Sequence, residues 1–134
     1  MTPPGARPPQ GGRPVPDRRG LGVHAERLAA DHLLAHGYRI LTRNYRTRGG
    51  ELDLVAQDGD TIVFVEVRAR TRADLGEPFE TIGPTKQRRV ARAAETWLVA
   101  HGATRAPARF DVVSILLAPG AAPAIELIQN AFET

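Results

Sequence analysis

The sequence contains no cysteine, which excludes disulfide bonds, thiolate zinc sites and cysteine nucleophiles. The absence of cysteine agrees with a reducing compartment, and we expect a cytoplasmic protein. No run of about 18 apolar residues is present, so we expect no membrane-spanning helix. Proline, glycine and arginine fill residues 1–19 in place of the apolar stretch of a signal peptide, so we expect no export by that route.

Lysine is nearly absent too, because Lys86 is the only lysine among 18 basic residues and all the others are arginine. Arginine recognises phosphate through a planar fork of donors. An arginine-rich composition is equally typical of proteins from genomes rich in G and C, so it does not by itself indicate a nucleic-acid partner. Aromatic residues make up only 5% of the chain, which argues against base stacking on single strands as the main mode of binding.

The chain has 134 residues, a length that fits one domain. Residues 1–19 show no apolar periodicity, and we expect a disordered basic tail there, followed by a single domain over residues 20–134. From Leu21 onward, apolar residues recur at helical spacing. This pattern predicts a helix over residues 20–36, which Gly37 ends.

Extended segments follow this helix. They are predicted at residues 38–44, 51–57 and 61–69. The Asp58-Gly59 turn joins the last two into a hairpin, because such a turn needs the positive φ that glycine accepts. Strict alternation in the second segment places Leu52, Leu54 and Ala56 on one face.

A loop is expected over residues 70–83, and a second helix over residues 84–101 begins at a proline and is followed by a glycine. A strand is predicted over residues 109–117, with a candidate final strand over residues 125–128. The predicted order is therefore αβββαβ with one candidate strand after it, and the fold class is α/β.

Carboxylates occupy positions that an apolar core disfavours. Asp53 interrupts an apolar strand, and Glu66 lies in a run otherwise suited to burial. A lone carboxylate there costs several kcal/mol unless it is paired, protonated or bound to a cation. Alternation puts Glu66 and Arg68 on one side, the hairpin brings Asp53 near Glu66, and Glu26 borders the apolar stripe of the first helix.

Converging carboxylates suit Mg²⁺, or Mn²⁺ in its place, because hard cations prefer oxygen ligands. Such a metal lowers the pKa of a bound water and offsets charge on a phosphate, which is the chemistry of phosphodiester hydrolysis. The alternative is structural: Glu66 forms a partly buried ion pair with Arg68 or another arginine.

The spacing from Asp53 to Glu66-Val67-Arg68 resembles that of the PD-(D/E)xK nuclease superfamily. Over residues 20–132, phrases such as Gly-Glu-Leu-Asp-Leu-Val-Ala, Val-Phe-Val-Glu-Val-Arg-Ala-Arg and Pro-Thr-Lys-Gln-Arg-Arg are similar to the bacterial YraN-type family of endonuclease-like proteins. This resemblance implies a restriction-endonuclease-like fold with a central mixed sheet flanked by helices. A more distant likeness to archaeal Holliday-junction resolvases implies metal ligands at Asp53 and Glu66, with Glu26 contributing directly or through water.

One position departs from the motif, because its lysine is Arg68 here. Arginine stays protonated, so Arg68 can donate hydrogen bonds or offset charge but cannot act as a general base. Lys86, at the start of the second helix, is expected to face the site or a phosphate; the alternative is an ordinary solvated lysine.

Basic residues surround the acidic ones in the sequence. The candidates for phosphate contact are Arg43, Arg46, Arg48, Arg68, Arg70, Lys86 and Arg89. If they meet on one face, binding will depend on salt and be largely independent of sequence.

The leading hypothesis is a Mg²⁺-dependent endonuclease on structured, branched or damaged DNA, in DNA repair or recombination. Its catalytic residues are Asp53, Glu66 and Arg68. A noncatalytic DNA-binding or scaffolding module that retains the nuclease fold is the alternative from another class, and an RNA-processing nuclease is a third. A homodimer would suit the cleavage of two strands.

Overall fold

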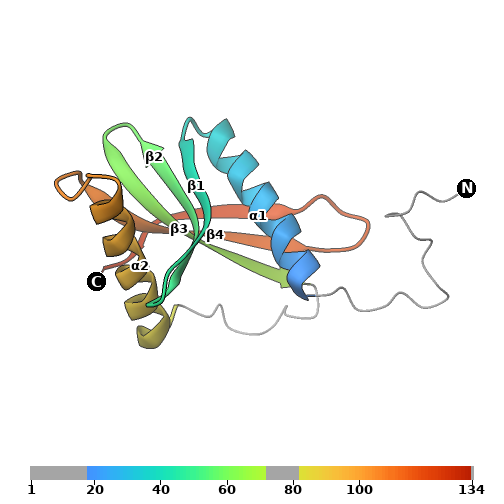
Figure 1. Cartoon of the computed structure of the whole chain (residues 1–134). Helices are drawn as coiled ribbons and strands as arrows, with labels where there is room; N and C mark the ends of the chain where they lie inside the picture. Colours follow the sequence, from blue (N-terminus) through green and yellow to red (C-terminus); the bar gives the residue numbers. More distant parts are fainter. Residues whose placement is uncertain (1–17, 72–81, 134) are drawn as a thin grey trace, which may run out of the picture.

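The computed structural model describes residues 18–71 and 82–133 (Figure 1). Its elements are α1 (Arg18–Ala35), β1 (Arg39–Arg46), β2 (Glu51–Asp58), β3 (Thr61–Thr71), α2 (Pro84–Ala100), β4 (Ala108–Leu117) and β5 (Ala124–Phe132). The predicted α/β class and element order are confirmed, and the candidate final strand is real. The first helix begins two residues before its predicted start. Residues 1–17 of the predicted tail and residues 72–81 of the predicted loop lie outside the described residues.

The five strands form one mixed sheet in the order β1-β2-β3-β4-β5. Neighbouring strands are antiparallel except for β3 and β4, which run parallel. A parallel pair needs a crossover connection, and α2 lies in the segment that joins these two strands. The predicted hairpin is present, because Asp58 pairs with Thr61 and Gly59 has a φ of 60°.

The two helices cover opposite faces of the sheet. On β3, Val63 and Val65 pack in the cluster that contains the buried residues of α1, whereas Ile62 and Phe64 pack in the cluster that contains those of α2. This alternation explains the nearly continuous apolar run of β3, since both of its faces are buried. The architecture is an α/β domain consistent with the restriction-endonuclease-like core that the resemblance implied.

One predicted face is wrong. Leu52, Leu54 and Ala56 were predicted to share one face of β2. Leu54 and Ala56 do pack together, on the α1 side, but Leu52 packs on the α2 side. Residues two positions apart in a regular strand point to the same face, so β2 breaks its alternation between Leu52 and Leu54. The residue at the break is Asp53.

The core of the α2 side is anchored by Trp97, one of the buried residues of that helix. The indole is 3% exposed, and its Nε1 donates a hydrogen bond of 2.8 Å to Thr42 Oγ1 on β1. Its ring meets Phe64 edge-on at 6.0 Å between centroids. These contacts join the helix to the sheet.

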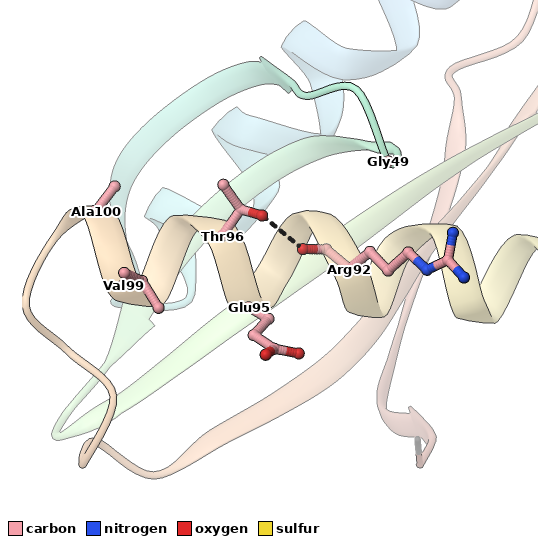
Figure 2. A pocket seen from close by; sticks show the side chains of 6 residues that line it. All are labelled: Gly49, Arg92, Glu95, Thr96, Val99 and Ala100. Atoms are coloured by element: carbon pink, nitrogen blue, oxygen red, sulfur yellow. Dashed lines mark hydrogen bonds between the residues drawn. The ribbon is translucent and has the colours of Figure 1, made fainter.

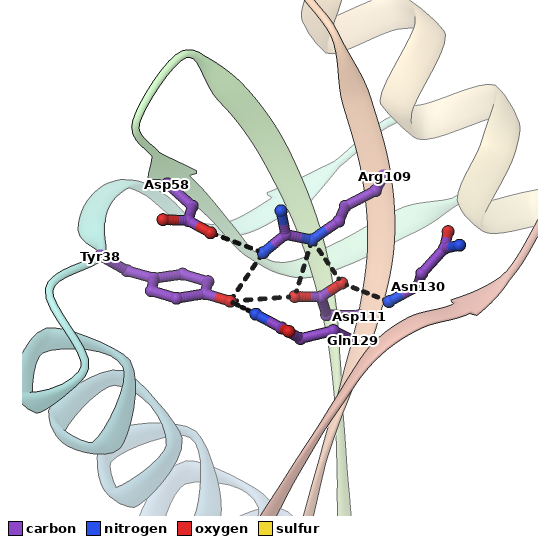
Figure 3. A network of polar contacts seen from close by, with 6 residues as sticks. All are labelled: Tyr38, Asp58, Arg109, Asp111, Gln129 and Asn130. Atoms are coloured by element: carbon purple, nitrogen blue, oxygen red, sulfur yellow. Dashed lines mark hydrogen bonds and ion pairs between the residues drawn. The ribbon is translucent and has the colours of Figure 1, made fainter.

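A buried polar network ties the α1 side together (Figure 3). The Asp111 carboxylate is fully buried and accepts hydrogen bonds from Arg109 Nε at 3.0 Å and from the backbone N–H of Asn130 at 2.9 Å. Arg109 also donates to Tyr38 Oη at 2.7 Å and to Asp58 at 2.9 Å. Asp111 is therefore paired internally, and the network joins β4 to β5, to the β2–β3 hairpin and to the residues after α1.

Neither helix in the described part of the chain has the length and apolarity needed to cross a membrane.

Candidate functional site

The candidate site lies at a fork between β2 and β3. These strands pair from Asp58 and Thr61 as far as Leu54 and Val65, and Asp53 comes directly after the last pair. The Asp53 Oδ2 accepts a hydrogen bond of 2.8 Å from the backbone N–H of Val67. The carboxylate thus occupies the place of a strand partner, and this bond fixes its position beside β3.

Glu66 lies next to this bond, on the α2 side of the sheet. Its side chain is only 9% exposed, and it follows Val65 and precedes Val67, whose N–H binds Asp53. Burial and the charge of Asp53 raise the pKa of Glu66 to about 8. At neutral pH Glu66 therefore keeps its proton, because burial and a neighbouring carboxylate both disfavour its charged form.

Lys86 contacts the same carboxyl group from α2. Its Nζ lies 3.4 Å from Glu66 Oε1, and the lysine side chain is 40% exposed. The residue follows Pro84 and Thr85 at the start of the helix, and the next residue, Gln87, donates a hydrogen bond of 2.7 Å from Nε2 to the carbonyl of Ile82. The only lysine of the chain is thus held between the acidic pair and solvent.

Glu26 approaches the pair from α1. It is partly buried, and its pKa is raised by burial and by the charge of Asp53. A hydrogen bond from the side chain of Asn44 and the charge of Arg46 oppose that rise. Glu26 is therefore within electrostatic reach of Asp53.

The described residues contain no group of three or more His, Asp or Glu side chains that could hold a metal ion by themselves. The close acidic contact is that of Asp53 with Glu66, so a direct third ligand from Glu26 is not preformed. Two carboxylates still suit Mg²⁺, which usually keeps several waters and phosphate oxygens in its coordination shell. The donor set fits a hard cation with Glu26 acting through water.

Arg68 lies on the same side of β3 as Glu66, because the flanking Val67 and Ala69 pack against the α1 cluster. It is partly buried and opposite Ser114 of β4. Arg70 lies one alternation further along, opposite Leu116. Both therefore extend the line of polar positions that begins at Glu66.

Comparison with known proteins identifies the chain's relatives. The model of the family described as "Uncharacterised protein family UPF0102" matches residues 25–115. The chain belongs to this family. It is 49% identical over 116 residues to a UPF0102 protein of Anaeromyxobacter dehalogenans, covering 87% of this chain and 86% of that one. It is 50% identical over 113 residues to one of Geobacter sulfurreducens, with coverage of 84% and 88%.

The region that matches UPF0102 contains Glu26, Asp53, Glu66 and Lys86. A more diverged member from Nocardia farcinica is 43% identical over 118 residues, covering 88% of this chain and 93% of that protein. The identification confirms the family resemblance that the sequence phrases carried. It assigns no activity, because the relatives' names give only the family.

In this UPF0102 member, the β1–β2 loop brings arginines against α2. Gly50 is buried, and a Cβ there would overlap the carbonyl oxygen and carbon of Arg89. Only glycine permits this approach of two backbones. Arg48 precedes this close approach by two residues, and both Arg48 and Arg89 are exposed.

The other predicted phosphate contacts are distributed along β1. Arg43 is exposed there, and so is Arg46, whose Nε lies 3.8 Å from Glu51 Oε2. Glu51 is 45% exposed, so its carboxylate is solvated. Sequence reasoning missed Asn44, between the two arginines, and a signal was present because asparagine is uncommon inside a strand.

A hollow of about 550 Å³ lies elsewhere, on the outer side of α2 (Figure 2). It is lined by Gly49, Arg92, Glu95, Thr96, Val99 and Ala100. Arginine and glutamate of opposite charge both line it, so it does not select an anion. Neither member of the acidic pair lines this hollow, and nor does Lys86.

Proposed function

We propose that this UPF0102 protein is a divalent-metal-dependent endonuclease that hydrolyses phosphodiester bonds in structured or branched DNA. The observation that carries the proposal is the buried contact of Asp53 with Glu66, with Lys86 Nζ at 3.4 Å from the same carboxyl group. Groups whose pKa is strongly shifted by burial and by a specific charged neighbour concentrate at functional sites.

The acidic pair is suited to a cation because two carboxyl groups lie together and the nearby lysine does not ionise both. The Nζ of Lys86 lies 3.4 Å from Glu66 Oε1, and the pKa of Glu66 is still raised to about 8. Asp53 and Glu66 would hold Mg²⁺ or Mn²⁺ in place of the proton of Glu66. The metal would supply a water of lowered pKa and offset the charge of the phosphate.

The protein's own residues would perform the remaining tasks. Lys86 is partly exposed and can donate a hydrogen bond to a phosphate oxygen or orient a water. It can also exchange a proton, which Arg68 cannot, because a guanidinium keeps its charge at any ordinary pH. The lysine from α2 thus offers the chemistry that the motif position on β3 lacks.

The substrate class follows from the charged surroundings. Arg43, Arg48 and Arg89 are exposed, and exposed arginines would bind phosphates and orient the backbone of a nucleic acid. The likeness to resolvases favours branched DNA over a single strand. A homodimer would supply two sites for the two strands of such a substrate.

The test is a cleavage assay on an end-labelled four-way junction, with duplex DNA, single-stranded DNA and duplex RNA in parallel, in Mg²⁺ or Mn²⁺. We expect the wild type to cleave the junction. In Asp53→Asn and Lys86→Met the cleavage rate should fall about 100-fold or more, which is the order of magnitude for losing one metal ligand or one general acid–base group. Glu51→Gln is the matched control and should cleave like the wild type.

Arg68→Lys separates the two classes of function. If Lys86 already supplies the titratable cation, Arg68→Lys should change cleavage little. Cleavage that appears only in Arg68→Lys would mean that the native site is degraded. DNA binding without cleavage in either form would support a noncatalytic module, and RNA cleavage in place of DNA cleavage would change the substrate class.

A further inference from the structure

The start of α2 departs from the usual chemistry of a helix N-terminus. Its N-cap residue, Gly83, makes no side-chain capping bond, and its first turn contains no acidic residue. The first turn contains basic Lys86 instead, although the positive end of the helix dipole disfavours a cation. Stability alone does not explain this arrangement, and departures from local rules are expected at functional sites.

Gln87 joins this helix start to the chain that precedes it. Its side-chain Nε2 donates a hydrogen bond of 2.7 Å to the carbonyl oxygen of Ile82. Its backbone N–H donates one of 2.9 Å to the carbonyl oxygen of Gly83. The two bonds close a short loop over residues 82–87, and Lys86 lies inside this loop, one residue before Gln87.

The side-chain bond of Gln87 is not a helix cap. A cap accepts a hydrogen bond from one of the free N–H groups of the first turn. Gln87 instead donates to a carbonyl oxygen that lies before the helix, so this bond satisfies none of those N–H groups. Ile82 is 6% exposed, and the bond therefore ties the helix start to a residue that burial holds in place.

Lys86 needs such a constraint to stay in the site. Its Nζ lies 3.4 Å from Glu66 Oε1, but its side chain is 40% exposed. A lysine side chain is long and flexible, so holding it in one partly exposed contact costs rotamer entropy. A fixed backbone limits the positions that Nζ can reach and lowers this cost.

We propose that Gln87 is a positioning residue, whose two hydrogen bonds fix the backbone at Lys86 and thereby hold Nζ at the Glu66 carboxyl group. The inference rests on the proposed function, because Lys86 is the titratable cation of that site. In this role Gln87 acts only through Lys86 and contacts no reacting atom.

The test uses the full chain labelled with ¹³C-lysine. Lys86 is the only lysine, so its side chain gives a single Cε signal in a nuclear magnetic resonance spectrum. Gln87→Met keeps the length of the side chain and removes the donor. We expect the Lys86 signal of this variant to move towards its position in the urea-unfolded chain. A purely structural role would lower the free energy of unfolding and leave the signal in place.

Gln57→Met is the matched control, because it makes the same substitution at a partly buried glutamine of β2. Its Lys86 signal should match that of the wild type.

Junction cleavage identifies the route. In Gln87→Met, kcat should fall by about 10- to 100-fold with KM unchanged, because a displaced lysine is lost from the chemical step and not from DNA binding. In a Lys86→Met background the same substitution should cause no further loss. An unchanged Lys86 signal in Gln87→Met, or an equal loss of cleavage in both backgrounds, overturns the inference.

The proposed function fails separately, by an absence of cleavage in the wild type. The lysine signal then decides alone. A shift in Gln87→Met and none in Gln57→Met would retain the positioning role, and no shift in Gln87→Met would refute it.

Discussion

Replacing Glu66 with glutamine should change how the stability of the protein depends on pH. The pKa of this carboxyl group is about 8 in the folded chain, against 4.5 for an ordinary glutamate. Between these values the folded state keeps a proton that the unfolded state has released. The contribution of Glu66 to the free energy of unfolding therefore falls as the pH rises from about 4.5 to about 8 and is level on either side.

The size of the effect follows from the shift. Each pKa unit corresponds to about 1.4 kcal/mol, so the full difference sets an upper limit of about 5 kcal/mol for the stability lost across this range. Glutamine keeps the shape of the side chain and carries no charge at any pH. We expect Glu66→Gln to be more stable than the wild type by about 2 to 5 kcal/mol above pH 8 and to differ little near pH 4.5.

The assay is urea unfolding from pH 4.5 to 9 in the presence of a chelator, followed by the fluorescence of the buried Trp97. Glu51→Gln is the control, because it makes the same substitution at a carboxylate that is 45% exposed. Parallel pH profiles of the wild type and Glu66→Gln would refute the argument that burial beside Asp53 holds the proton.

Three further predictions concern the framework and the basic surface. Asp111→Ala should cost about 3 to 5 kcal/mol in urea unfolding, because it removes the buried acceptor of Arg109; a cost below about 1 kcal/mol would contradict this. Gly50→Ala should lose about 1 to 3 kcal/mol by overlap with the backbone of α2, whereas Gly22→Ala, a helical position with open space around it, should gain about 0.5 to 1 kcal/mol. Arg48→Ala should lower the slope of log affinity for duplex DNA against log salt by about 0.9, and an unchanged slope would exclude a phosphate contact.

The order of elements could be predicted from the sequence because each element carries a local signal. The apolar run of β3 and the Asp58-Gly59 turn depend on residues that are near one another in the chain. The same holds for Gly37, which ends α1 with a φ of 88°. Local chemistry alone decides these features, so no knowledge of the packed structure was needed.

The break in β2 could not be predicted in this way. Strict alternation puts Leu52 and Leu54 on one face, yet they pack on opposite sides of the sheet. The break depends on Asp53 leaving the strand pairing to accept the N–H of Val67, a contact across 14 residues. Long-range packing overrides the period of the strand there.

The candidate site shows the same division. Asp53 and Glu66 could be singled out because a carboxylate in an apolar strand is anomalous by itself. The contact of Lys86 with Glu66 depends on how α2 packs on the sheet. In the sequence, the only sign that Lys86 mattered was that it is the one lysine of the chain. The left-handed backbone of Asn44, with a φ of 54°, is likewise not revealed by its neighbours in the chain.

The central claim is that Asp53 and Glu66 hold a divalent cation, and calorimetric titration of Mg²⁺ into the full chain tests it most directly. The titration is run with and without a non-cleavable junction DNA, on the wild type, Asp53→Asn, Glu66→Gln and the control Glu51→Gln. The account predicts binding in the wild type and the control and its loss in both site variants. An absence of Mg²⁺ binding in the wild type under both conditions, or binding unchanged by Asp53→Asn and Glu66→Gln, would contradict it.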